Sequence, residues 1–164
     1  MIIIFLDIDG VLLPFGHQDE KKGRIFPSCT LGALSYVLEE LPDAQLVLSS
    51  TWRVQQSFID MIVKDFRTYG GSVLKNTEFY DTTNPQLHSE RQHEIYEWLR
   101  QNHSRSNIRA WIALDDEELL EGEMNATHRN LFERHVVKTD SHVGMTMEDA
   151  LRAVTLLRNQ LHRK

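Results

Sequence analysis

The sequence has one cysteine, few prolines, no long apolar run and no excess of basic residues. Because a single cysteine cannot form an internal disulfide, the chain fits a reducing compartment, and we expect a cytoplasmic protein. No partner base is evident near Cys29, so we interpret it as a small buried side chain rather than a nucleophile. A membrane-spanning helix needs roughly 18 apolar residues in succession. The chain has no such run, so we expect no membrane association.

Acidic residues outnumber basic ones by 24 to 18, which gives a formal net charge of -6. Non-specific nucleic-acid binding depends mostly on Lys and Arg contacts to phosphates, so this balance argues against a broad phosphate-binding surface. A narrow cationic groove is still compatible with it. Basic residues are densest in the C-terminal segment ALRAVTLLRNQLHRK, which we interpret as a solvated helix face.

The rest of the composition is that of an ordinary globular protein, with 164 residues of which 41% are hydrophobic and 26% are charged. No repeat, low-complexity tract or linker divides the chain, so we expect one domain over residues 1–164. The segment 13–28 departs from this pattern because it carries two prolines, two glycines and several charges. We interpret that segment as a flap.

Strands and helices are predicted to alternate along the chain. Short apolar runs predict strands at residues 2–6, 45–48, 109–114 and 135–138, with a further short strand near 72–74, and residues 76–88 are interpreted as a loop. Apolar residues at helical spacing predict four helices: about 30–41, about 52–68, one from near 90 with Ser89 as N-cap, and one after Thr146, with Asp149 as its capping-box partner.

This alternation predicts an α/β fold, a three-layer Rossmann-like domain with a mainly parallel central sheet between helical layers. Ligands of such folds bind beyond the carboxyl ends of the strands. Polar residues follow three of the predicted strands at that end, namely Asp7, Ser49 and the pair Asp115-Asp116. We therefore expect these side chains to meet at one crevice.

The segment Asp7-Ile8-Asp9-Gly10 is the most informative part of the sequence. Two carboxylates just past a buried strand are costly without a compensating cation, and a glycine allows the sharp turn that follows. Magnesium prefers hard oxygen ligands, commonly takes one or two protein carboxylates and keeps positions for phosphate and water. The alternative interpretation is a solvated turn that happens to carry two acids.

Asp115 and Asp116 repeat this pattern after the apolar run AWIAL. One of them would complete a metal site, while the other would orient a water or a neighbouring side chain. Acids also favour helix N-termini, and EELLEGE follows, so an ordinary helix start is the alternative interpretation.

Ser49 and Ser50 lie at a strand end directly before a predicted helix, where hydroxyl and backbone N–H groups can hold a phosphate oxygen. An ordinary N-cap is the alternative there. Arg91, early in its helix, would supply the fixed cation that a transferring phosphoryl group needs, or else form a surface ion pair. Arg53 would either reach a further substrate phosphate or pair with a nearby acid. The three tryptophans are interpreted as core residues rather than stacking platforms: Trp52, Trp98 and Trp111.

In this order, the pieces resemble the haloacid dehalogenase (HAD) superfamily of phosphatases. Its signature is DxD after the first strand, Ser or Thr after the second, a Lys or Arg further on, and a late acidic pair. The segments FLDIDGVLLP, LVLSSTWR, RQHEIYEWL and IALDDEEL look like the HAD phosphatase domain of Swiss Army Knife RNA repair proteins. The cation here is Arg91 where Lys is commoner, and Lys75 is the other candidate.

The resemblance implies that Asp7 attacks phosphorus and forms an aspartyl-phosphate. Asp9 would protonate the leaving oxygen and then activate the water that cleaves this intermediate. A Mg²⁺ ion is assigned to four aspartates: the carboxylates of Asp7 and Asp116, the backbone carbonyl of Asp9, and Asp115 in support. The phosphoryl oxygens are assigned to three residues: Ser49, Ser50 and Arg91.

Superfamily members usually select substrates with cap domains inserted after the first or second motif. Only about 40 residues separate Asp7 from Ser49, and a similar number separate Ser49 from Arg91, so we expect no substantial cap. We expect a phosphomonoesterase, and nucleotide or polynucleotide ends are one class of substrate that an open site would accept. The alternatives are a phosphatase of a small metabolite or phosphoprotein, and a non-catalytic phospho-Asp signalling or scaffold domain.

Overall fold

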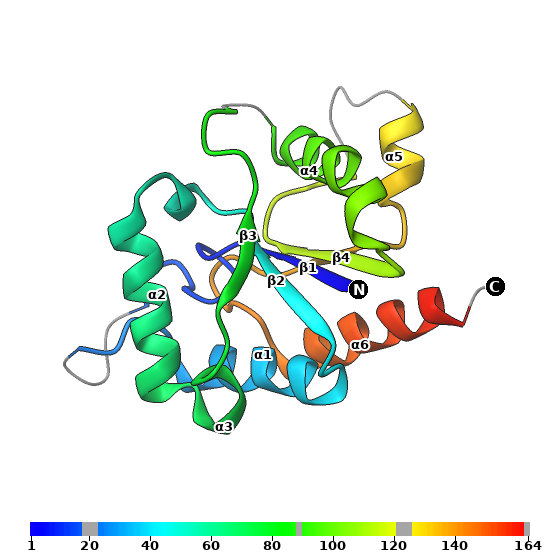
Figure 1. The fold of residues 1–164 in the computed structure, drawn as a ribbon. Helices are drawn as coiled ribbons and strands as arrows, with labels where there is room; N and C mark the ends of the chain where they lie inside the picture. Colours follow the sequence, from blue (N-terminus) through cyan, green and yellow to red (C-terminus); the bar gives the residue numbers. More distant parts are fainter. Residues whose placement is uncertain (18–22, 88–89, 121–125, 163–164) are drawn as a thin grey trace.

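A computed structural model of the protein describes residues 1–17, 23–87, 90–120 and 126–162 (Figure 1). Within these residues, five parallel strands form one sheet in the order β3-β2-β1-β4-β5. The strands are β1 (Ile2–Leu6), β2 (Ala44–Leu48), β3 (Phe79–Thr82), β4 (Ala110–Asp115) and β5 (Val136–Lys138). The predicted α/β fold with a parallel sheet is therefore confirmed, as are the strands predicted at 2–6, 45–48, 109–114 and 135–138.

Helices cover both faces of the sheet, which makes three layers. The helical elements are α1 (Ser28–Glu40), the 3-10 helix η1 (Thr51–Val54), α2 (Gln56–Tyr69), α3 (Gly71–Leu74), α4 (Arg91–Ser106), α5 (Ala126–Phe132) and α6 (Met147–Leu161). Figure 1 shows α4 and α5 above the sheet, α1 and α6 below it, and α2 on the left. Within the described residues, no further domain is inserted between these elements, so the fold has no cap.

The central strand β1 explains the three layers, because every residue of its apolar sequence IIIFL is buried. Successive side chains of a strand point to opposite faces. Ile2, Ile4 and Leu6 belong to the core that α1 and α6 close. Ile3 and Phe5 belong to the second core, under α4 and α5. A strand covered on both faces has no polar alternation, which is why its apolar run predicted a buried position.

Two predictions around β3 were wrong. The segment 76–88 is not all loop, because it contains β3. This strand lies at the sheet edge, and its residues FYDT are half-buried or exposed, so no buried apolar run marked it. Residues 72–74 are not a strand but belong to the short helix α3, which begins at Gly71 with a φ of 68°.

The helix boundaries also differ in part from the predictions. The helix expected at 52–68 is two elements, because Gln55 is extended between η1 and α2. Helix α4 begins at Arg91 with Glu90 at the N-cap and no side-chain cap, whereas Ser89 lies outside the described residues. The capping box of Thr146 and Asp149 at the start of α6 is confirmed. Helix α5 was not predicted.

Two further expectations concern the segment between β1 and α1. Cys29, expected to be buried, is exposed on α1, so that prediction was wrong. The predicted flap at 13–28 lies partly outside the described residues, and the described residues 13–17 and 23–27 form no helix or strand beyond an isolated bridge of Leu13 with Asp9. No helix within the described residues is long and apolar enough to cross a lipid bilayer.

Candidate active site

Each strand of the described sheet is continued by a polar residue, or ends in one, at its carboxyl end. Backbone hydrogen bonds between neighbouring strands continue at these ends, each from an N–H group to a carbonyl oxygen over 3.0 Å. The pairs are Asp7 to Leu114, Ser49 to Leu6, Thr83 to Leu48 and Thr139 to Asp115. The side chains that meet at this edge are all at most 4% exposed: Asp7, Ser49, Thr83, Asp115 and Thr139. Burial of so many polar groups at one edge is costly unless they bind one another or a ligand.

The strand register turns three of these residues towards the same helical layer. Leu6 lies opposite Leu48 in β2 and opposite Leu114 in β4, so the next residues, Asp7, Ser49 and Asp115, are also level. Level residues of parallel strands share a face of the sheet. That face is the one covered by α4, which brings Arg91 to the same edge.

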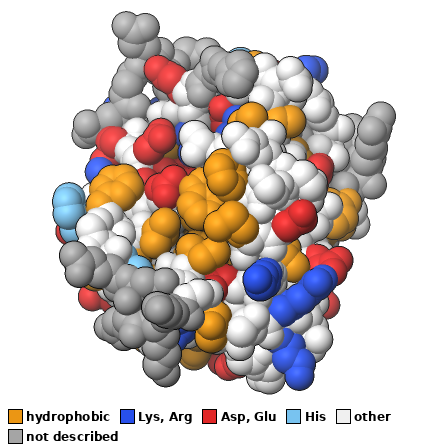
Figure 2. Space-filling view, turned by 90° about the vertical axis from the view of Figure 1, so that its left-hand side faces the viewer, with side chains coloured by type: hydrophobic (Ala, Val, Ile, Leu, Met, Phe, Trp, Pro, Cys, Tyr) orange, Lys and Arg blue, Asp and Glu red, His pale blue; other side chains and the backbone are white. Residues whose placement is uncertain are grey.

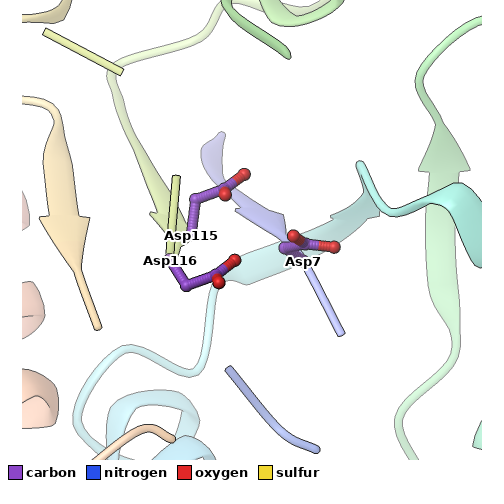
Figure 3. A group of neighbouring side chains, drawn as sticks. All are labelled: Asp7, Asp115 and Asp116. Carbon is purple, nitrogen blue, oxygen red and sulfur yellow. The ribbon is translucent and has the colours of Figure 1, made fainter. Parts of the chain in front are cut away.

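Three carboxylates form a group with the spacing of a metal site (Figure 3). Asp7, Asp115 and Asp116 each offer one oxygen, and these oxygens lie within 4.8 Å of one another. Asp7 follows β1, Asp115 ends β4 and Asp116 follows it, and Figure 3 shows their side chains close together. Three acids of one sign at this distance repel one another, and a divalent cation with a preference for oxygen ligands would offset that repulsion. The group fits the predicted magnesium ion, with Asp9 contributing no carboxylate to it.

Burial raises the pKa of Asp7 from an ordinary value of 3.8 to about 6. Three neighbours favour the charged carboxylate and lower its pKa: the Arg91 guanidinium, the Ile8 N–H and the Ser50 hydroxyl. The Ile8 N–H donates to Asp7 Oδ1 over 2.8 Å. Together they do not cancel the effect of burial. The charge of Asp116 raises the pKa further. The side chain is therefore held in a defined orientation, yet its charge is only partly compensated by the protein itself.

Asp115 is fully buried, and its pKa is raised well above the usual range by burial and by the charge of Asp7. One oxygen accepts the Glu117 N–H over 2.9 Å. The other, Oδ2, lies 3.1 Å from Arg91 Nε, but the two are not aligned for a hydrogen bond. Burial also raises the pKa of Asp116, and the charges of Glu117 and Asp9 add to this effect. These uncompensated carboxylates are the chemical argument for a bound cation.

Arg91 is the cation that the fold brings to these acids. Its guanidinium lies 3.5 Å from Asp7 Oδ2 and 3.3 Å from Glu94 Oε2. Burial alone lowers the pKa of Arg91, but the carboxylates of Asp7, Asp115 and Glu94 outweigh that effect and raise it. The guanidinium is therefore charged at all working pH values. Lys75 is exposed at the C-cap of α3 and makes no ion pair with the described acids.

A second arginine supports Arg91 through a shared carboxylate. Glu94 Oε1 accepts a hydrogen bond of 2.7 Å from Arg53, and both side chains are almost fully buried. Arg53 also donates to the Ser50 carbonyl over 2.8 Å. Of the two interpretations of Arg53, the structure shows pairing with an acid. Arg53, Glu94 and Arg91 thus form a row of alternating charges that ends at the catalytic acids predicted from the sequence.

The remaining predicted residues occupy separate positions around this edge. Asp9 is half-buried, and its Oδ2 accepts a hydrogen bond of 3.0 Å from Trp52 Nε1. The Ser49 hydroxyl is buried and has no hydrogen-bond partner among the described residues, so it is available to a ligand oxygen. Ser50 caps η1 by accepting the Trp52 N–H over 3.4 Å.

Several residues at this edge were not singled out for it by sequence reasoning. Glu94 lies one helical turn after Arg91, a spacing that favours an ion pair. Trp98 and Trp111 are core residues as predicted, but Trp52 is only partly buried and contacts Asp9. Thr139 follows β5 as Asp7 follows β1, and its hydroxyl donates to the Gly10 carbonyl over 2.8 Å. The shared rule of a polar residue after a strand would have found it.

Comparison with known families agrees with this geometry. A family model described as the HAD domain in Swiss Army Knife RNA repair proteins matches residues 3–150. The match covers most of the chain and includes all the strand-end residues described above, so the resemblance recognised in the sequence is confirmed. No curated protein and no solved structure matches the chain.

Proposed function

The chain belongs to the family of HAD domains in Swiss Army Knife RNA repair proteins, and on this premise we propose that it is a Mg²⁺-dependent phosphomonoesterase. The observation that carries the proposal is the pairing of three clustered carboxylates with one buried arginine. Hydrolysis of a phosphate ester needs a nucleophile, a cation beside the phosphoryl oxygens and a site that binds metal, and this cluster contains groups suited to each task. We also propose that residues 1–164 form one such domain.

Asp7 is the nucleophile in this proposal. Its carboxylate forms a bond to phosphorus as the bond from phosphorus to the ester oxygen breaks, and the product is an aspartyl-phosphate. The Ile8 N–H supports this role because it fixes the orientation of the carboxylate. Burial supports it as well, because a poorly solvated carboxylate retains its reactivity towards a bound phosphoryl group.

Asp9 moves the protons. It donates one to the leaving ester oxygen in the first step. In the second step it accepts one from the water that attacks phosphorus, and the bond between phosphorus and Asp7 breaks to release phosphate. The geometry supports this division of labour, because among the described residues the Asp9 side chain is not part of the three-carboxylate group and accepts a hydrogen bond from Trp52.

Three groups bind the phosphoryl oxygens in the proposal: the Ser49 hydroxyl, Ser50 and the Arg91 guanidinium. The carboxylates of Asp7 and Asp116 and the Asp9 carbonyl would hold Mg²⁺, with Asp115 in support. The ion supplies positive charge that stabilises the transferring phosphoryl group. Arg91, held beside Asp7 at the start of α4, supplies a fixed positive charge without any change of protonation.

The proposed substrates are phosphorylated polynucleotide ends. Two observations support this class: the family description refers to RNA repair, and no cap domain covers the site in the described residues. A small metabolite would gain little from an open site, whereas a polynucleotide end needs one.

The test is a panel of phosphate esters assayed with Mg²⁺, comprising oligonucleotides with a 3′- or 5′-phosphate, mononucleotides, sugar phosphates and a phosphopeptide. We expect the highest kcat/KM on an oligonucleotide end and loss of all activity in Asp7→Asn. Activity confined to small sugar phosphates would contradict the substrate class. Hydrolysis that survives Asp7→Asn unchanged would contradict the mechanism itself.

A further inference from the structure

The indole of Trp52 lies beside the group that protonates the leaving oxygen in the proposed function, on which this inference rests. Trp52 Nε1 donates to Asp9 Oδ2 over 3.0 Å. A leaving group whose ester oxygen takes a proton from the Asp9 carboxyl group would come close to the Trp52 indole. The surface around Trp52 is therefore where contacts to a leaving group are sought.

That surface is aromatic and apolar. The Phe58 ring packs on Trp52 with centroids 5.4 Å apart, and Phe58 keeps 37% of its surface exposed. Val54, at the end of η1, is 52% exposed. Figure 2 views the molecule from the side on which α2 lies and shows hydrophobic side chains gathered next to acidic ones on that face. Trp52 itself is only partly buried against the core, so the open part of this aromatic pair is formed mainly by Phe58.

Arg53, which follows Trp52 in η1, offers no free charge to a polynucleotide backbone. The one basic residue of η1 is Arg53, and its guanidinium is buried and bound to Glu94 and the Ser50 carbonyl. The excess of acidic residues over the whole chain points in the same direction. Bases can add affinity for a nucleic-acid end at this surface, because they bind aromatic side chains by stacking whatever their sequence.

We propose that Trp52 and Phe58 form a stacking subsite for the base of the nucleotide that carries the scissile phosphate. A base paired within a duplex has its faces covered by neighbouring pairs, so the subsite takes a terminal, unpaired base. This assigns the substrate class of the proposed site as single-stranded or frayed polynucleotide ends. Phe58 is then a specificity-determining residue.

The test compares substrates that differ only in the base. A nucleoside monophosphate and the corresponding ribose phosphate without a base are assayed as kcat/KM with Mg²⁺. Stacking predicts that the base raises kcat/KM roughly 5- to 150-fold in the unmodified protein. Phe58→Ala is expected to lose most of this ratio. The matched control is Leu151→Ala, which truncates an equally apolar side chain, 52% exposed on α6, and should leave the ratio unchanged.

Trp52→Phe separates the ring from its N–H group. The variant keeps an aromatic face, so the preference for a base should persist. The variant loses the hydrogen bond that orients Asp9. A nucleotide has a poor alkoxide leaving group that needs a proton from Asp9, whereas the phenoxide of p-nitrophenyl phosphate leaves without protonation. Hydrolysis of the nucleotide should therefore slow more than hydrolysis of p-nitrophenyl phosphate. Equal slowing of both substrates would contradict the assignment of Trp52 as the residue that positions Asp9.

A binding measurement tests the subsite without turnover. An oligonucleotide that ends in 2-aminopurine with a terminal phosphate is titrated with the Asp7→Asn protein, and stacking should quench its fluorescence. The double variant Asp7→Asn/Phe58→Ala should bind it more weakly. An unchanged base-to-ribose ratio in Phe58→Ala, together with no quenching, would overturn the subsite. If quenching occurs but no ester is hydrolysed, the proposed function fails while the subsite stands.

Discussion

Gly10 leaves the space that the carboxylate of Asp116 occupies. A Cβ atom on residue 10 would collide with Asp116 Cγ, closer than real Cβ contacts allow. The backbone of Gly10 also has a φ of 73°, a left-handed conformation that side chains disfavour. The turn after β1 therefore determines the position that the Asp116 side chain can occupy after β4. It thereby also determines the geometry of the three-carboxylate group.

Gly10→Ala should weaken Mg²⁺ binding by roughly 10- to 100-fold, because the added methyl group displaces Asp116 from the carboxylate group. The matched control is Gly16→Ala. Gly16 has a similar φ of 77°, but among the described residues beyond its chain neighbours no atom lies within 4 Å of the added Cβ, so Gly16→Ala has the backbone strain without the collision. Isothermal titration with Mg²⁺ measures both variants. Equal affinities in the two variants would contradict the role of this contact.

Glu94→Gln should destabilise the protein by about 3–5 kcal/mol, because it leaves Arg53 and Arg91 buried with less compensating charge. It should also weaken inhibition by inorganic phosphate, since Arg91 loses the partner that orients it. Glu97→Gln is the control on the same helix, because its partner Arg100 is exposed and the loss should be much smaller. Chemical denaturation and phosphate inhibition constants provide the readouts. A Glu94→Gln protein as stable as Glu97→Gln would refute the supporting role of Glu94.

The order of the strand ends could be predicted from the sequence, because a buried apolar run followed by an acid or hydroxyl is a local pattern. Asp7, Ser49 and Asp115 lie level at one edge as that pattern implied. The edge strand β3 was not predicted, because its residues are half-buried or exposed and do not form an apolar run in the sequence.

Contacts between distant elements could not be predicted in this way. Arg53 and Glu94 are 41 residues apart, and Trp52 and Asp9 are 43 apart. Each residue alone is compatible with a surface position, and one sequence carries no record of which charges are paired. The same limit applies to Gly10, whose need for a turn was predicted but whose collision with Asp116 depends on the packing of β1 against β4.

The metal-free protein should lose stability as the pH rises through about 6. The pKa of Asp7 is raised from 3.8 to about 6 in the folded state, so the folded protein holds this proton more tightly than the unfolded chain does. The stability that protonated Asp7 contributes to the folded state is fully present below pH 3.8. It is lost as the pH rises through about 6, the pKa of Asp7 in the folded protein. The raised pKa values of Asp115 and Asp116 act in the same direction.

Mg²⁺ should reverse this trend, because it binds the ionised carboxylates. The gain in Tm on adding Mg²⁺ should therefore be larger at pH 7.5 than at pH 5, and smaller at both values in Asp7→Asn. Thermal unfolding with EDTA or with Mg²⁺ at the two pH values measures these differences. A gain in Tm that is independent of pH would contradict the placement of the ion at these acids.

The central claim is that Asp7 carries the phosphoryl group. The most direct measurement is to quench a single turnover in acid, reduce the trapped acyl phosphate with borohydride and locate the modified residue by mass spectrometry. The account predicts homoserine at position 7 in the unmodified protein and none in Asp7→Asn. Modification of Asp9, Asp115 or Asp116 instead, or turnover with no trapped residue, would contradict it.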